Sequence, residues 1–120
     1  MEACRRNVTT FVRRDSRLVA FGWLNAFGVH SAFAHFCVLR SDWFQTAELG
    51  AQMLERWMSF TKPDGSPLLQ LILGTIPVEN QRAIRFVNRI GFKTCGMIPK
   101  LVVDQLGRFR DAELLYFERE

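Results

Sequence analysis

The sequence contains little cysteine, and its three cysteines are not arranged as metal-binding or disulfide pairs. Cys4, Cys37 and Cys95 are odd in number and lie far apart, and none belongs to a CxxC motif. Such a set argues against a disulfide framework and against a tetrahedral zinc site. We therefore predict free structural thiols, a reduced cytoplasmic setting and no metal centre.

We also predict that the chain has neither a targeting segment nor a membrane span. The N-terminal residues are rich in arginine and lack an apolar core, so they do not have the pattern of a signal peptide. Residues 18–39 carry no Asp, Glu, Lys or Arg, and their length is near that of a membrane helix. They nevertheless include Asn25, His30 and His35, with Gly22 and Gly28 between apolar residues. Two aromatic-rich strands around a turn near 28–31 explain this segment better, and we predict no contact with a membrane.

The composition fits one folded domain spanning residues 1–120. The chain is 48% hydrophobic and 23% charged, an ordinary balance for a globular domain. Its net charge is +4, and arginine supplies more of the positive charge than lysine. Arginine suits forked contacts with phosphate or carboxylate groups. No basic run concentrates these residues. Nucleic-acid binding through the arginines is therefore the weakest of the three functions that the sequence suggests.

The first half of the sequence predicts three strands and a helix. Residues 8–14, 17–27 and 32–39 are rich in β-branched and aromatic residues, and Asp15-Ser16 is a turn signal between the first two. Together they predict an antiparallel meander. Apolar residues then recur at helical spacing over 46–60, where Thr46 suits the N-cap position.

The second half predicts a strand, a helix and a hairpin. The apolar run 68–76 follows a Lys-Pro-Asp-Gly turn, fits a strand buried on both faces, and is ended by Pro77. A helix over 81–90 follows, with Asn80 as its N-cap and Gly91 as its left-handed final residue. Its polar side carries three aligned residues: Arg82, Arg85 and Arg89. Residues 93–103 and 109–117 predict a hairpin. The element order predicts an α+β (mixed α/β) fold, a mixed sheet with two main helices.

The second helix also carries the most specific motif in the chain. Asn80, Ala83, Phe86 and Gly91-Phe92 follow the spacing that is common in the GNAT family of N-acetyltransferases. Further matches follow in the last two predicted strands: Gly96, Gly107, Asp111 and Tyr116. From about Val8 onward the chain therefore resembles a GNAT domain. It resembles a short, N-terminally reduced member, similar to compact acetyltransferase-like proteins of tailed phages.

The resemblance implies a mostly antiparallel sheet that splays open between two parallel central strands, here residues 32–39 and 68–76. The pantetheine arm of acetyl-CoA would lie in the gap, with its pyrophosphate over the turn that starts the helix at Thr46. The family's pyrophosphate motif is matched by Gln45-Thr-Ala-Glu48-Leu-Gly50. The cofactor-binding residues that the resemblance implies are Val38, Leu39, Arg40, Gln45, Thr46, Gly50, Asn80 and Phe86.

Three features depart from the family pattern. Glu48 replaces the first motif glycine and would repel a pyrophosphate, unless Arg40 or an arginine of the second helix offsets its charge. Val87 stands where many members have a tyrosine that protonates the departing thiolate. The family's first strand and most of its first helical region, which usually form one wall of the acceptor site, have no counterpart before Met1.

Four side chains are candidates for the proton transfers of acetyl transfer. His35 lies on the strand that would border the cofactor and suits proton transfer near neutral pH. Glu79 is a second candidate base and Tyr116 a candidate acid, while Cys37 is a further candidate for the missing proton donor. Each has a structural alternative: a hydrogen-bonded sheet histidine, an acid at a helix N-terminus, a strand tyrosine and a buried thiol.

The sequence therefore predicts an acyl-CoA-dependent N-acyltransferase. It would transfer acetyl from acetyl-CoA to an amine of a protein or of a small molecule by direct attack. The main alternative is a catalytically impaired GNAT-fold binding module that regulates or inhibits a protein partner. The acceptor stays open, as does a homodimer in which a second copy supplies the missing wall.

Overall fold

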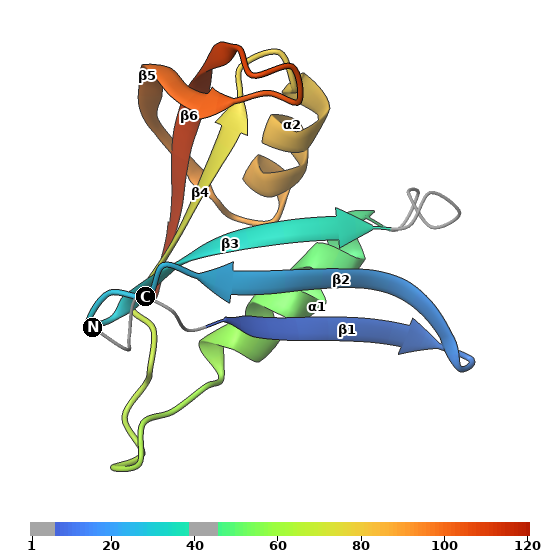
Figure 1. Cartoon of the computed structure of the whole chain (residues 1–120). Helices are drawn as coiled ribbons and strands as arrows, with labels where there is room; N and C mark the ends of the chain where they lie inside the picture. Colours follow the sequence, from blue (N-terminus) through green and yellow to red (C-terminus); the bar gives the residue numbers. More distant parts are fainter. Residues whose placement is uncertain (1–6, 39–45) are drawn as a thin grey trace.

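The computed structural model describes residues 7–38 and 46–120 (Figure 1). They form one six-stranded mixed sheet with strand order β1-β2-β3-β4-β6-β5. The helices α1, Thr46–Met58, and α2, Gln81–Arg89, lie beside it. The predicted α+β architecture is confirmed.

The first three strands form the predicted antiparallel meander: β1 spans Val8–Arg14, β2 Arg17–Asn25 and β3 Ser31–Val38. Asp15 and Ser16 connect β1 to β2 with φ angles of 53° and 66°, a positive pair that fits a tight two-residue hairpin. The uncharged segment of the sequence thus forms strands up to Val38. Among the residues that the structure describes, no helix has both the length and the apolarity needed to cross a membrane.

Helix α1 packs on the meander through its tryptophan. Trp57 is completely buried, and its Nε1–H donates a hydrogen bond to Thr10 Oγ1 of β1 at 2.9 Å. Gly22 of β2 lies beneath it: a Cβ there would come within 3.0 Å of both the Met53 sulfur and the Trp57 ring, and 2.7 Å from the His35 carbonyl oxygen. The absence of a side chain at position 22 therefore lets the helix approach the sheet closely.

The second half of the sheet consists of β4, Leu71–Pro77, β5, Lys93–Val103, and β6, Phe109–Glu118, with β6 between the other two. Asp104 fixes the hairpin between β5 and β6. Its carboxylate accepts hydrogen bonds from the backbone N–H groups of Leu106 and Arg108 and from the side chains of Arg108 and Arg110. These donors lower the pKa of Asp104 to about 2, with the Arg108 backbone N–H first among them.

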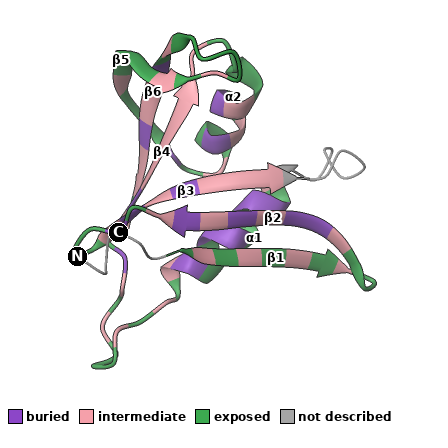
Figure 2. Ribbon diagram, in the orientation of Figure 1, coloured by how far each residue is buried: buried purple, intermediate pink, exposed green. Residues whose placement is uncertain are grey.

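Both helices lie on the same face of the sheet, so the core has two layers (Figures 1 and 2). Phe36 of β3 shows this directly, because its ring contacts Trp57 of α1 at a centroid distance of 5.2 Å and Phe86 of α2 at 5.5 Å. Phe92, just after α2, completes the cluster at 6.2 Å from Phe36. The aromatic cluster around Phe36 thus joins the two halves of the core.

The prediction that the apolar run 68–76 forms a strand buried on both faces is wrong. Within β4 only Ile72 is buried, and the other strand residues are half-buried. Ile72 lies on the helix side, whereas no described helix covers the opposite face. The strand also begins later than predicted, because Leu68 donates its backbone N–H to the Phe60 carbonyl and Leu69 enters the core from the preceding loop.

We expect Gly22→Ala to destabilise the fold by about 1–3 kcal/mol, because the new methyl group has to displace α1 or the β3 backbone. Gly74 of β4 is the matched control, since nothing lies within 4 Å of a Cβ placed there. Gly74→Ala should leave the free energy of unfolding unchanged or slightly higher. Chemical denaturation of both variants measures the difference, and equal unfolding free energies would contradict the proposed close approach of α1.

Candidate active site

The central feature of the candidate site is the short ladder between β3 and β4. These neighbouring strands run parallel but pair only from Ser31↔Leu71 to Phe33↔Leu73. Beyond this point β3 continues to Val38 beside β2, while β4 continues to Pro77 beside β6. The sheet therefore opens between its two central strands, as predicted, and the opening is visible in Figure 1.

Backbone groups of β3 face this opening. The His30 carbonyl accepts hydrogen bonds from the backbone N–H groups of Gln70 and Leu71, so the even-numbered positions of β3 turn their polar groups toward β4. Successive residues of a strand alternate in this direction. Ala34, Phe36 and Val38 therefore present N–H and C=O groups to the opening beyond the last ladder pair. A chain of amides, such as a pantetheine arm, could pair with such an edge.

The first turn of α1 carries the acidic Glu48, and the structure shows which charge offsets it. Arg14 at the end of β1 donates from Nη2 to Glu48 Oε1 at 2.8 Å. The two side chains are 33% and 61% exposed, so the pair contributes at most about 1 kcal/mol and can rearrange readily. The sequence suggested Arg40 or the α2 arginines for this role. It gave no signal for Arg14, which is 34 positions away along the chain.

Two of the predicted cofactor residues contact each other. Gly50 of α1 is buried, and a Cβ at this position would lie 2.5 Å from Phe86 Cζ of α2. Gly50 therefore has at least a packing role, because it lets the two helices meet. Asn80 caps α2 as predicted, with Oδ1 accepting from the Ala83 backbone N–H at 3.2 Å. Val87 is buried in the core on the inner side of α2.

Of the other predicted cofactor residues, Leu39, Arg40 and Gln45 lie outside the described residues. Val38 and Thr46 are described through their backbone alone, as the last residue of β3 and the first residue of α1. Their predicted roles stay predictions.

His35 lies on β3 two residues beyond the last pair with β4, on the face of the sheet opposite the helices. It stacks on Trp23 of β2 with ring centroids 4.8 Å apart and an interplanar angle of 14°. Its Nε2 lies 3.1 Å from Asn25 Oδ1, and burial lowers the pKa of His35 below its usual 6.5. The imidazole is therefore neutral near pH 7, which is the form that can accept a proton.

Glu79 and Tyr116 do not join His35 directly. Glu79 follows β4 at the open end of the sheet, where its Oε1 lies 3.6 Å from Arg110 Nε. Tyr116 of β6 pairs with Leu73 and Lys93, on the same sheet face as Phe33 and His35. The width of β4 separates Tyr116 from His35. Of His35, Glu79 and Tyr116, the structure thus places His35 at the opening between β3 and β4.

Sequence reasoning missed Asn25 and Trp23 as neighbours of His35. Trp23↔His35 is a directly opposed antiparallel pair, and Asn25 is the next residue of β2 on the same face. The sequence predicted the two strands on either side of the turn near 28–31. It did not predict the register of their pairing, which brings these particular side chains together.

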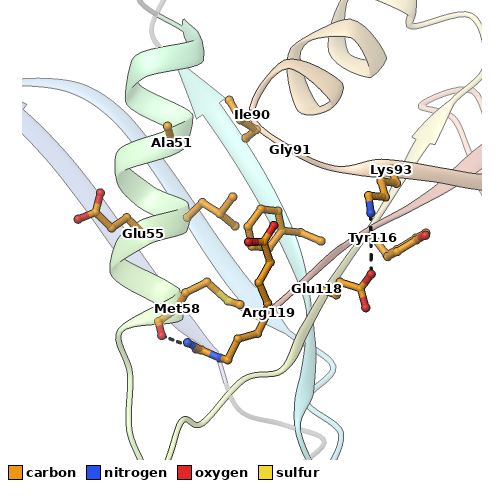
Figure 3. A pocket seen from close by; sticks show the side chains of 12 residues that line it. Ala51, Glu55, Met58, Ile90, Gly91, Lys93, Tyr116, Glu118 and Arg119 are labelled. Atoms are coloured by element: carbon orange, nitrogen blue, oxygen red, sulfur yellow. Dashed lines mark hydrogen bonds and ion pairs between the residues drawn. The ribbon is translucent and has the colours of Figure 1, made fainter.

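A separate groove of about 800 Å³ lies between α1 and the end of β6 (Figure 3). Leu54 and Met58 of α1, Gly91 and Phe117 line it, and a 3.9 Å ion pair between Lys93 and Glu118 lies at its edge. Arg119 crosses its lower end and donates hydrogen bonds to the backbone carbonyls of Met58 and Leu69. Of the predicted site residues that the structure describes, Tyr116 alone borders the groove, so this groove is distinct from the opening between β3 and β4.

No protein-family model matches the sequence, and no curated protein sequence matches it. Solved structures do match it in fold. The spermidine N-acetyltransferase of Vibrio cholerae, in complex with CoA and spermine, superposes with a TM-score of 0.75 at 20% identity, covering 93% of this chain and 65% of that one. A GNAT-family acetyltransferase from Streptococcus pneumoniae superposes with a TM-score of 0.73 at 18% identity, covering 94% and 67%.

These matches show that the chain has a GNAT-like fold. The chain spans about two thirds of the length of the structures that it matches. The predicted similarity to phage proteins stays a prediction.

The lowered pKa of His35 predicts a pH dependence of stability. Between the folded pKa and 6.5 the unfolded chain binds more protons than the folded chain, so the free energy of unfolding should fall as the pH drops below about 6.5. His35→Gln should remove this part of the dependence. His30→Gln, which removes the other histidine of the chain, is the matched control. Denaturation at a series of pH values between 5 and 8, spaced ~0.5 units apart, measures this dependence. Identical dependences of the free energy of unfolding in His35→Gln and in the wild type would contradict its assignment to His35.

Proposed function

We propose that the protein is an acyl-CoA-dependent N-acyltransferase that acetylates an amine by direct attack on a bound thioester. The observation that carries the proposal is the opening of the sheet after Phe33↔Leu73, with His35 on β3 just beyond it. This arrangement provides a free backbone edge for an amide-containing cofactor and a neutral base at the same point. The fold of the matched acetyltransferases supports it.

The residues along the opening fit a CoA-type cofactor. Ala34, Phe36 and Val38 would offer backbone hydrogen bonds to the pantetheine arm. The first-turn N–H groups of α1 have no partners within the helix and would attract the pyrophosphate, together with the predicted Leu39, Arg40, Gln45 and Thr46. Arg14 would offset Glu48 or exchange it for a phosphate, since their exposed ion pair is weak.

His35 would act as the base. Its neutral imidazole would take a proton from the acceptor ammonium, which frees the nitrogen lone pair for attack. Acetyl-CoA would supply the activated acyl group: as the C–N bond forms and the C–S bond breaks, the attacking nitrogen would lose its second proton and the thiolate would take up a proton. Val87 cannot provide that proton, and Tyr116 lies across β4. Cys37, two residues beyond His35 on the same face of β3, is the nearest further donor on that strand.

The acceptor is an amine whose identity is open. One of the matched enzymes was crystallised with spermine. A panel containing spermidine, spermine and lysine-containing peptides is therefore the first to test, with mass spectrometry to detect a mass increase of one acetyl group.

Binding of acetyl-CoA is the decisive measurement. We expect calorimetry to give a saturable heat with acetyl-CoA for the wild-type chain. Glu48→Gln should tighten the dissociation constant about 3- to 10-fold at low salt, because it removes a negative charge near the pyrophosphate, and added salt should shrink the gain. Glu55→Gln, further along α1, is the matched control and should have little effect.

The absence of heat at millimolar acetyl-CoA would contradict the proposed function. The binding-module alternative would then be favoured by the aromatic rings on the uncovered sheet face. Phe11, Phe21 and Trp23 form a continuous row across β1 and β2, with centroid distances of 6.4 and 6.2 Å, and Phe11 is 56% exposed. Rings of this kind are common at the centre of protein interfaces.

A further inference from the structure

The surroundings of His35 determine which of its ring nitrogens can act as a base. Nε2 lies 3.1 Å from Asn25 Oδ1, and an amide oxygen can only accept a hydrogen bond. Nε2 must therefore carry the proton in the neutral ring. The lone pair of the neutral imidazole then lies on Nδ1, for which the described residues provide no hydrogen-bond partner.

The plane of the imidazole is fixed by a second contact. The Trp23 ring lies nearly parallel to it, 4.8 Å away, and Trp23 is opposite His35 in the ladder between β2 and β3. Trp23 is itself held in the aromatic row through Phe21, at 6.2 Å. A hydrogen bond at one edge and a stacked ring on one face together leave the imidazole little freedom to rotate or flip.

In the described strands around His35, the neighbouring side chains on the same sheet face are uncharged. The strands around His35 contribute Phe21, Trp23 and Asn25 from β2, Phe33 and Cys37 from β3, and Leu73 and Thr75 from β4 to the same face. None of these carries a full charge as a carboxylate or an ammonium group, and Cys37 is the one titratable neighbour. The cause that lowers the pKa of His35 is accordingly burial.

We propose that Asn25 and Trp23 are positioning residues for His35: the Asn25 amide oxygen holds the proton on Nε2 and Trp23 holds the ring plane, so that Nδ1 is the nitrogen left to accept the acceptor's proton. The tautomer follows from contacts in the free protein. Its consequence for catalysis rests on the proposed function.

The tautomer can be measured without substrate. The chain contains two histidines, His30 and His35, so ¹⁵N-labelled histidine gives two ring systems, which His30→Gln assigns. Long-range proton–nitrogen correlation spectra above pH 7 should show the His35 proton on Nε2. In Asn25→Leu the two tautomers should interconvert, and Asn88→Leu, at an exposed position of α2, should leave the wild-type pattern. A wild-type proton on Nδ1, or an unchanged tautomer in Asn25→Leu, would overturn the proposal.

A second variant links the geometry to catalysis. It also provides a test that does not depend on whether the Asn25→Leu variant folds. Asn25→Asp places a carboxylate on Nε2–H and should raise the His35 pKa in the free protein by about one unit. The acidic limb of kcat/KM should move to higher pH by the same amount, while KM for acetyl-CoA should change little. Asn25→Leu should lower kcat by roughly 10-fold or more.

The two proposals fail in different ways. If the spectra show the expected tautomers but no amine is acetylated by the wild-type chain, the proposed function is overturned while the positioning of His35 stands. If transfer occurs and the His35 pKa rises in Asn25→Asp without a shift of the rate profile, His35 is not the base and the catalytic role of Asn25 is overturned.

Discussion

The three residue pairs that join β3 to β4 are the constraint on which the rest of this molecule depends. Within the sheet they form the direct ladder between a unit of β1, β2, β3 and α1 and a unit of β4, α2, β5 and β6. The cluster around Phe36 holds the same two units together on the helix side, through Trp57 in one and Phe86 in the other. Because the ladder stops while the cluster continues, the sheet can open along one edge and keep a single core.

The opening of the sheet determines which strands and side chains surround His35. A strand in the middle of a continuous sheet is paired on both sides, whereas β3 beyond Phe33 is paired with β2 alone. All three strands around His35 are nearly free of charge, so its neutrality arises from partial burial and its orientation from Asn25 and Trp23. The same lack of charge leaves the uncovered face apolar and aromatic, and this face supports the alternative of protein binding.

Much of the fold was predictable because its signals are local. Asp15-Ser16 provides the positive φ angles of a tight turn, Asn80 caps α2 with its own side chain, and Gly91 ends that helix with a φ of 114°. Each of these depends on residues within a few positions along the chain. The motif in α2 added the arrangement of the strands, since it placed the predicted elements in a GNAT-like order. The burial of β4 was predicted wrongly, because an apolar run shows that a strand is buried but not that a second layer covers its other face.

The sequence by itself determined the turns, the helix ends, the element order and the presence of a histidine on the third strand. Short-range periodicity and backbone preference suffice for these features. Only the tertiary structure decided that Arg14 neutralises Glu48, that Gly50 receives the ring of Phe86, and that Trp23 and Asn25 hold His35. These contacts depend on strand register and on the distance between helices. Register brings together residues that are far apart in the chain, and the residue types alone do not specify which of them become partners.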